Sequence, residues 1–235
     1  MSREYRMLKN KERKEEILNL VNSSKKITVE ELAKRTYASP STIRRELKIL
    51  EGQGLLRRRH GGAESVLYLR PPQIIRHLNN QNEKKIIAKK ASALIKPESC
   101  IFIDASTTVQ YIIPYLAGIQ RITVYTNGAD TAIKLAEAGV KVICTGGNLL
   151  SESMAYVGSV AADTVRKVYF DAVFFSSAAF DESVISDWSE EETVLRRAVI
   201  EQSVKRYFLA DGSKQGKRYA HIVCRLSEVD EIISE

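Results

Sequence analysis

The chain has 235 residues, of which 44% are hydrophobic and 28% are charged, and its formal net charge at pH 7 is +7. This composition is typical of a globular protein, and the length suits a small domain joined to a medium one. No apolar run is long enough to span a membrane and the first residues are charged, which excludes a membrane protein and a signal peptide and predicts a cytoplasmic location.

Two short helices are predicted at the start of the chain. Residues 11–22 carry apolar side chains at helical spacing. Thr28 is the predicted N-cap of a second helix that runs from Val29 to about Thr36, and Glu31 would complete a capping box with it. A turn at Tyr37-Ala38 is expected to end this pair.

A third helix is predicted to begin after Ser39, with Pro40 in its first turn, and to run to Glu51, where Gly52 and Gly54 end it. One face is aliphatic (Ile43, Leu47 and Leu50) and the remainder is polar and basic. Two helices joined by a tight turn, the second of them basic, predict a helix-turn-helix, whose second helix enters the DNA major groove. Its predicted DNA contacts are Ser41, Thr42, Arg44, Arg45 and Lys48.

An arginine-rich strand with a turn at Gly61-Gly62 follows and predicts the wing of a winged helix. The predicted contacts of the wing with the DNA backbone or minor groove are Arg57, Arg58, Arg59 and His60. From Met1 to Ala63 there are 16 Lys and Arg against 8 Asp and Glu, whereas the remainder has 20 against 21. The excess positive charge therefore lies in the first quarter of the chain, as phosphate-backbone binding requires. A three-helix bundle with a merely basic surface is the alternative.

Residues 64–82 are predicted to form a linker. The segment contains Pro71-Pro72, which stiffens a connector, and a polar run over residues 79–82. An amphipathic helix is expected from Glu83 onward. We therefore expect a DNA-binding domain at residues 1–63, a linker at 64–82 and an effector-sensing domain at 83–235.

The second domain is predicted to be α/β. Short apolar runs alternate with helical segments, a pattern that favours a mostly parallel sheet covered on both faces. The predicted strands are residues 100–103, 122–125, 140–144, 172–175, 207–210 and 221–224.

Polar residues follow four of these strands. Ligands of such sheets bind at the carboxyl ends of the strands, and glycines there permit close backbone approach. A lysine offers a point charge to a phosphate, so an anion site is expected at this edge. The predicted effector-binding residues are Asp104, Ser106, Thr107, Thr108, Thr126, Asn127, Gly146, Gly147 and Lys214.

The three cysteines, Cys100, Cys144 and Cys224, lie far apart in apolar runs and predict reduced thiols. The three histidines form no metal-spaced pair with each other or with cysteine. We expect neither a metal site nor a cofactor.

Two groups of motifs closely resemble the DeoR family of bacterial sugar-metabolism regulators. The first comprises the runs 41–47 (STIRREL) and 54–63 (GLLRRRHGGA). The second comprises 104–108 (DASTT), Thr126-Asn127, Gly146-Gly147, Val157-Gly158, the loop 181–187 and 211–216 (DGSKQG). The second group is similar to the family's sensor domain, which resembles the ribose-5-phosphate isomerase fold. The chain departs from the family pattern at Glu46, Ser106, Ala179, Val184 and Gln215.

The resemblance implies a winged helix-turn-helix followed by an isomerase-like sensor, and a phosphorylated sugar or sugar derivative as effector. It adds Asp181 to the expected effector site. Ser189 is predicted to cap a helix whose first-turn glutamates, Glu192 among them, act only in capping. Trp188 is expected at a pocket rim or an interface.

Three functions are open at this point. The first is a sequence-specific DNA-binding regulator, usually a repressor of sugar-catabolism genes in this family, acting as a homodimer or homotetramer on paired operator half-sites. The second is a sugar-phosphate isomerase with an accessory nucleic-acid-binding domain, although no acid–base constellation can be placed around the polar strand ends. The third is a structural nucleic-acid protein, which leaves those strand ends unexplained. We expect the regulator, and not an enzyme.

Overall fold

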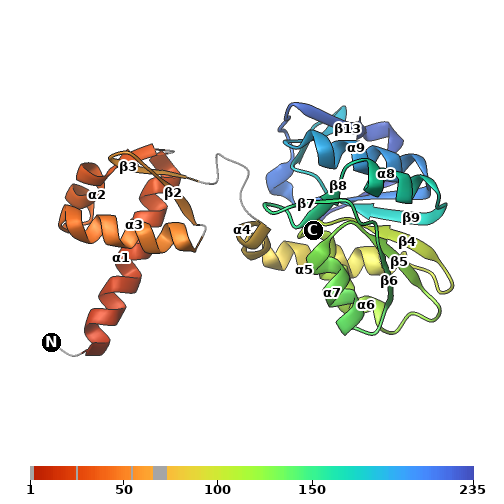
Figure 1. Ribbon diagram of the computed structural model, residues 1–235, viewed down its shortest axis with the longest axis horizontal. Coiled ribbons are helices and arrows are strands. Elements are labelled where there is room, and N and C mark those ends of the chain that lie inside the picture. The colour runs from red at the N-terminus through yellow and green to blue at the C-terminus, as the bar shows by residue number, and fades with distance from the viewer. Residues whose placement is uncertain (1–2, 25, 54, 66–72) are drawn as a thin grey trace. The chain divides into compact units, whose positions relative to one another are not determined.

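The computed structural model describes residues 3–24, 26–53, 55–65 and 73–235 (Figure 1). The chain divides into two compact units, Met1–Arg76 and His77–Glu235. Gly54, predicted to help end the third helix, and Pro71-Pro72, predicted to stiffen the linker, lie outside the described residues.

The N-terminal unit has the predicted helices and a small antiparallel sheet. Its helices are α1 (Arg3–Ser24), α2 (Val29–Arg35) and α3 (Pro40–Gly52), and its strands are β1 (Lys26–Thr28), β2 (Leu56–Arg59) and β3 (Gly62–Ser65). In the described part of this unit the strands pair in the order β1-β3-β2. The winged helix-turn-helix is therefore confirmed. The second strand of the wing extends to Ser65, two residues into the segment predicted as linker.

The predicted caps explain where α2 and α3 begin. Thr28 Oγ1 accepts from the Glu31 N–H at 3.1 Å, and Ser39 Oγ accepts from the Thr42 N–H at 3.2 Å. The second half of the predicted capping box is replaced, because the Glu31 carboxylate pairs with Arg35 at 2.9 Å. Both helices therefore start at the residue that their sequence indicates.

Aliphatic side chains from all three helices and from the wing form the core of this unit. Ile43, Leu47 and Leu50 are buried on one face of α3, as predicted, against Ile17 and Leu32 of α1 and α2. Burial of a side chain of this size contributes about 1.5–3 kcal/mol. The opposite face of α3 is thereby left at the surface.

The C-terminal unit is an α/β domain. Its helices are α4 (Gln73–Leu78, which begins in the other unit), α5 (Gln81–Ser92), η1 (Val109–Ile112), α6 (Ile113–Leu116), α7 (Ala129–Glu137), α8 (Ser159–Arg166), α9 (Glu190–Glu201), η2 (Gly212–Lys214) and η3 (Leu226–Glu228). Its strands are β4 (Cys100–Ile103), β5 (Thr123–Thr126), β6 (Lys141–Cys144), β7 (Asn148–Leu150), β8 (Ala155–Val157), β9 (Phe170–Phe175), β10 (Ala179–Phe180), β11 (Val184–Asp187), β12 (Ser203–Leu209), β13 (His221–Arg225) and β14 (Glu231–Ile233).

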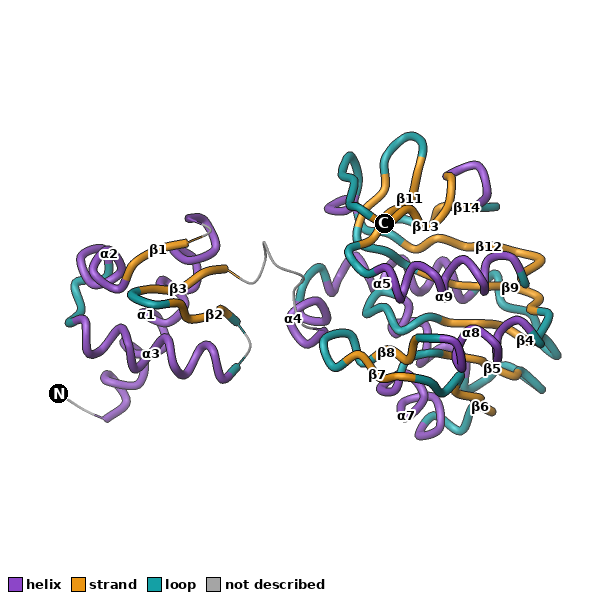
Figure 2. Tube along the Cα trace, turned by 45° about the horizontal axis from the view of Figure 1, so that its top comes forward, coloured by secondary structure: helices purple, strands orange, loops and turns teal. Residues whose placement is uncertain are grey.

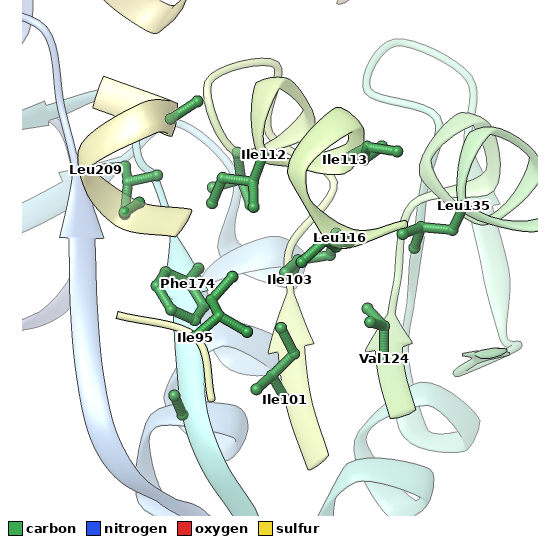
Figure 3. Close-up of a cluster of buried hydrophobic side chains, with 14 of the residues drawn as sticks. Ile95, Ile101, Ile103, Ile112, Ile113, Leu116, Val124, Leu135, Phe174 and Leu209 are labelled. Atoms are coloured by element: carbon green, nitrogen blue, oxygen red, sulfur yellow. The ribbon is translucent and has the colours of Figure 1, made fainter. Parts of the chain in front are cut away.

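Six strands form one parallel sheet in the order β14-β12-β9-β4-β5-β6 (Figure 2). Helices α5, α6 and α7 lie on one face and α8 and α9 on the other (Figure 1). The expectation of a mostly parallel sheet covered on both faces is confirmed. Figure 3 shows the core of the first face, where Ile101, Ile103 and Phe174 of the sheet meet Ile112 and Leu116.

One predicted strand lies outside the parallel sheet. The segment predicted at 221–224 forms β13, but β13 pairs antiparallel with β11 in a separate small sheet that also contains β10. The sixth strand of the parallel sheet is β14, which was not predicted. Parallel pairing needs a long crossover, usually through a helix, and the connection between β12 and β13 holds only the short turn η2.

Candidate functional site

The exposed face of α3 carries the predicted DNA contacts. Ser41, Arg44, Arg45 and Lys48 are exposed and Thr42 is half-buried. At the start of the helix Ser39 Oγ lies 2.9 Å from Ser41 Oγ and 2.8 Å from Thr42 Oγ1. Hydroxyls and backbone N–H groups at a helix N-terminus suit contact with DNA phosphates.

Several basic side chains of this surface are not paired with a carboxylate of the described residues. Within the described residues, Arg45, Lys48 and Arg57 form no ion pair, and Arg44 only approaches Glu30 at 4.0 Å. The other two wing arginines are paired, Arg58 with Glu51 at 2.6 Å and Arg59 with Glu64 at 2.7 Å. The first pair joins the wing to α3 and the second joins the two strands of the wing, and all of these arginines stay exposed.

A groove of about 510 Å³ lies between α3 and the wing, lined by Arg44, Leu47, Glu51, Arg58, Arg59 and His60 with Val29 and Gly61-Gly62. His60 is exposed beside it. Gly61 has φ +77°, a conformation that favours glycine at the tip of the wing. The structure thus brings together all nine predicted DNA contacts on one helix face and one wing.

Glu46, where the sequence departs from the family pattern, lies under this surface. Its side chain is 2% exposed and accepts from Arg13 Nε at 3.0 Å and from Nη2 at 2.6 Å. The ion pair joins α1 to α3. Glu46 therefore orients the helix and is not itself part of its exposed face.

In the C-terminal unit, Asp104 organises the loop after β4. Its Oδ1 accepts from the N–H of Ser106 at 3.0 Å and from the Ser106 hydroxyl at 2.5 Å. Its Oδ2 accepts from the Ser176 N–H at 3.3 Å and from Arg196 Nε at 3.0 Å. A carboxylate so enclosed fixes the loop.

Two lysines approach adjacent hydroxyls of the same loop. Lys84 Nζ, from α5, donates to Thr107 Oγ1 at 3.3 Å, and Lys214 Nζ donates to Thr108 Oγ1 at 3.3 Å and to Ser176 Oγ at 2.6 Å. Lys84 is 3% exposed, which is rare for lysine. We call Lys84, Thr107, Thr108, Ser176 and Lys214 the lysine cluster. Two ammonium groups and three hydroxyls can together hold an anion.

A buried arginine lies next to this cluster. Arg196 binds Asp104 at 3.0 Å, Asp187 at 2.9 Å and Glu192 at 2.9 Å, and the side chains of all four are at most 8% exposed. We call these four residues the arginine cluster. Burial acts to lower the pKa of Arg196, but the three carboxylates outweigh it and raise that pKa above its ordinary value. The guanidinium is a permanent charge around which the carboxylates are fixed.

Glu192 therefore does more than cap. Ser189 Oγ accepts from the Glu192 N–H at 3.2 Å, as predicted, but the carboxylate binds Arg196, so the expectation that it acts only in capping was wrong.

Trp188 packs against Tyr219, with ring centroids 4.6 Å apart.

Two predicted site residues, Thr126 and Asn127, lie at the carboxyl end of the neighbouring strand β5. Asn127 accepts from the Ala105 N–H at 3.0 Å and donates to the Tyr156 carbonyl at 3.2 Å. Thr126 Oγ1 accepts from the Gly128 N–H at 3.0 Å. Asn127 thereby positions the Asp104 loop, whereas Thr126 fixes the turn that follows β5.

Gly146 and Gly147 lie in the connection after β6. Gly147 has φ +108°, and a Cβ there would stand 2.5 Å from the Val157 carbonyl oxygen. The glycine is required by this close approach of the backbone.

Asp181 is held within its own hairpin. Its carboxylate accepts from the N–H groups of Ser183 and Val184 at 2.9 Å and pairs with Arg218 at 2.6 Å. The two backbone N–H groups are the main cause that lowers the pKa of Asp181. None of these contacts reaches the lysine cluster, so the structure does not join Asp181 to the other predicted effector residues.

Lys84, Ser176 and Arg196 were not predicted as site residues. Lys84 shares a helix face with Ile87, Ala88 and Ala91. A charged residue in a row of buried apolar positions is the signal that could have found it.

Comparison with known proteins follows the same division of the chain. Residues 13–67 match the family model described as "DeoR-like helix-turn-helix domain", and residues 79–235 match "DeoR C terminal sensor domain". The chain belongs to the DeoR family of transcriptional regulators. This membership excludes the alternative of a sugar-phosphate isomerase, because the family's members are DNA-binding regulators with a sensor domain and not enzymes.

Two relatives match over almost the whole chain. An uncharacterized HTH-type transcriptional regulator of Bacillus subtilis, YulB, is 34% identical over 95% of this chain and 88% of its own length. The lactose phosphotransferase system repressor of Staphylococcus aureus is 30% identical over 95% and 91%. Among solved structures, a D-ribose-5-phosphate isomerase in complex with phospho-erythronic acid matches 58% of this chain with 55% of its own, at 15% identity and a TM-score of 0.45.

In the part of the chain that the structure describes, no helix is both long and apolar enough to cross a membrane. The same residues contain no group of three or more His, Cys, Asp or Glu side chains placed to hold a metal ion.

Proposed function

We propose that this DeoR-family regulator is a repressor of sugar-catabolism genes whose operator affinity falls when a phosphorylated sugar binds the C-terminal domain. The observation that carries the proposal is the convergence of Lys84 and Lys214 on the adjacent hydroxyls of Thr107 and Thr108. The resulting density of donors suits the three oxygens of a phosphate group.

The arginine cluster supports a sugar as the remainder of the ligand. Asp104 belongs to it and also fixes the loop that carries Thr107 and Thr108. The surroundings of a phosphate bound at this loop are therefore polar, which suits a polyol better than an apolar group. The name of the Staphylococcus aureus relative, a repressor of a lactose phosphotransferase system, agrees with a sugar-linked role.

The effector site that we propose contains Asp104, Ser106, Thr107, Thr108 and Lys214, with Lys84 and Ser176 added. Thr126, Asn127, Gly146 and Gly147 would act by shaping the backbone around it. Asp181, between β10 and β11, remains part of the proposed effector site. It would contact the ligand from outside the lysine cluster.

The DNA-binding side of the proposal rests on the exposed cations of α3 and the wing. Helix-turn-helix proteins bind paired half-sites, so a homodimer or homotetramer is part of the proposal. So is the division into a DNA-binding domain at 1–63, a linker at 64–82 and a sensor domain at 83–235. The ligand would favour the state of the protein with lower operator affinity.

A thermal-shift screen of the full chain against phosphorylated sugars and their unphosphorylated counterparts tests the effector. A ligand that binds only the folded protein raises its melting temperature. We expect a rise with at least one phosphorylated sugar, none with its unphosphorylated counterpart, and loss of the rise in Lys84→Gln.

Lys85→Gln is the matched control, because Lys85 is the next residue of α5 and is exposed. An equal thermal shift in Lys84→Gln and Lys85→Gln would remove Lys84 from the site. A shift produced equally by the unphosphorylated sugar would contradict an effector that is recognised through its phosphate.

A further inference from the structure

Tyr37 has a backbone conformation that tyrosine rarely adopts. It follows the last turn of α2, where Ala38 N–H donates to the Ala33 carbonyl at 3.1 Å and Thr36 N–H to the Leu32 carbonyl at 2.9 Å. This pattern ends a helix with a left-handed residue, a position that glycine usually takes because a Cβ is strained there. Tyr37 takes it with φ +52°.

The strained conformation is not offset by packing of the Tyr37 side chain. The Tyr37 side chain is 98% exposed, and it forms no hydrogen bond to any described residue. Three of the other four non-glycine residues with positive φ in the described chain do have side-chain partners: Asn80 binds Asp211, and Glu98 pairs with Arg121. A strained, solvated aromatic residue indicates a contact with something outside the chain.

The position of Tyr37 indicates what that contact is. It lies two residues before Ser39, whose hydroxyl caps α3 and joins those of Ser41 and Thr42. The turn therefore places Tyr37 next to the N-terminal end of α3, which carries the predicted phosphate contacts. Tyrosine hydroxyls are common donors to DNA phosphate oxygens.

We propose that Tyr37 contacts the DNA backbone beside the half-site, with its hydroxyl donating to a phosphate oxygen. Such a contact strengthens binding to any duplex and carries no sequence information. This inference rests on the proposed placement of α3 in the major groove.

The test measures affinity of the full chain for a random-sequence duplex of about 30 base pairs across a range of salt concentrations. We expect Tyr37→Gly to raise Kd about tenfold, Tyr37→Phe to raise it about threefold, and neither to change the salt dependence, because a neutral phenol releases no counterion. Arg45→Ala should lower the salt slope by about one. Tyr169→Ala, at an exposed tyrosine of the C-terminal unit, is the matched control and should change neither.

Stability separates this role from a structural one. Glycine relieves the strain, so Tyr37→Gly should melt at the same temperature as the unmodified chain or higher. An unchanged Kd in Tyr37→Gly while Arg45→Ala weakens binding would overturn the inference alone. A lower melting temperature of Tyr37→Gly would also overturn the inference. So would a change in the oligomeric state of this variant without a change in its Kd for DNA. A chain that binds no duplex would overturn both this inference and the DNA-binding proposal.

Discussion

Asn80 donates from its side-chain amide to the carboxylate of Asp211 at 2.9 Å, across 131 positions of sequence. It also donates to Ser213 Oγ at 3.1 Å, and Asp211 accepts from the Ser213 N–H at 3.1 Å. The residue before α5 is thereby tied to the turn that carries Lys214. Lys84 lies near the start of α5. A ligand at the lysine cluster would therefore affect the start of this helix in two ways: directly through Lys84, and through Lys214, whose turn is bound to Asn80.

Removing the Asn80 amide should therefore uncouple the effector from the DNA response. Asn80 has φ +52°, so Asn80→Gly keeps the backbone conformation and removes only the side chain. We expect the sugar phosphate still to bind, as a thermal shift, but its effect on operator Kd to shrink at least about fivefold. The control is Asn79→Gly, at the exposed neighbouring position. An effector response equal to that of the unmodified chain would show that this contact carries no coupling.

Arg196 should be indispensable to the C-terminal unit. Arg196→Met leaves Asp104, Asp187 and Glu192 buried without their cation, and breaking a buried ion pair from one side costs about 3–5 kcal/mol. We expect a loss of that size in the free energy of unfolding, measured by denaturant titration. Arg197→Met changes an exposed neighbour on α9 and should cost far less. Similar losses in the two variants would contradict the structural importance of the arginine cluster.

Arg13 should stabilise the N-terminal unit through Glu46. Arg13→Ala leaves a buried carboxylate without its partner, which we expect to lower the free energy of unfolding by about 2 kcal/mol. The double variant Arg13→Ala with Glu46→Leu should recover much of that loss, because it removes the buried charge as well. Calorimetry of the full chain distinguishes the two outcomes, and a double variant no more stable than Arg13→Ala would argue against this account.

His77 should make the stability of the C-terminal unit depend on pH. Its ring stacks on Tyr111 with centroids 5.2 Å apart. Burial is the main cause that lowers the pKa of His77 below its ordinary 6.5, and the charges of Lys134 and Lys84 lower it further. The unfolded chain therefore binds the proton more readily, so the stabilising contribution is present above pH 6.5 and is lost as the pH falls through the lowered value.

His77→Phe keeps a ring against Tyr111 and removes the titration. We expect the unfolding free energy of this variant to fall less between about pH 7 and pH 5 than that of the unmodified chain. Equal slopes in denaturant titrations at the two pH values would show that His77 is not linked to folding.

Local signals in the sequence predicted the elements of the N-terminal unit well. The hydroxyls of Thr28 and Ser39 and the proline at position 40 mark helix starts by short-range chemistry, which the fold around them does not change. The parallel strands were also found, because buried strands are continuous apolar runs. The destination of β13 was not, since whether a strand joins one sheet or another depends on the connection between β12 and β13 and on contacts distant in sequence.

The candidate effector site was predicted only in part for a similar reason. Thr107, Thr108 and Lys214 follow strands and could be found from that position alone. Lys84 and Arg196 lie on helices that pack over the sheet, and only the tertiary fold brings them to the Asp104 loop. Both occupy positions on the helix face that otherwise buries apolar residues. In the sequence, a charged residue at such a position was the one sign that they belong to the site.

We propose that an anion held by Lys84 and Lys214 lowers the affinity of the exposed α3 surface for its operator. This is tested by the Kd of the full chain for a duplex selected from a random library, with and without the sugar phosphate that gives the largest thermal shift. We predict that this ligand raises Kd at least about tenfold for the unmodified chain and for Lys85→Gln, but not for Lys84→Gln. A sugar phosphate that binds the chain and leaves its Kd for DNA unchanged would contradict the claim.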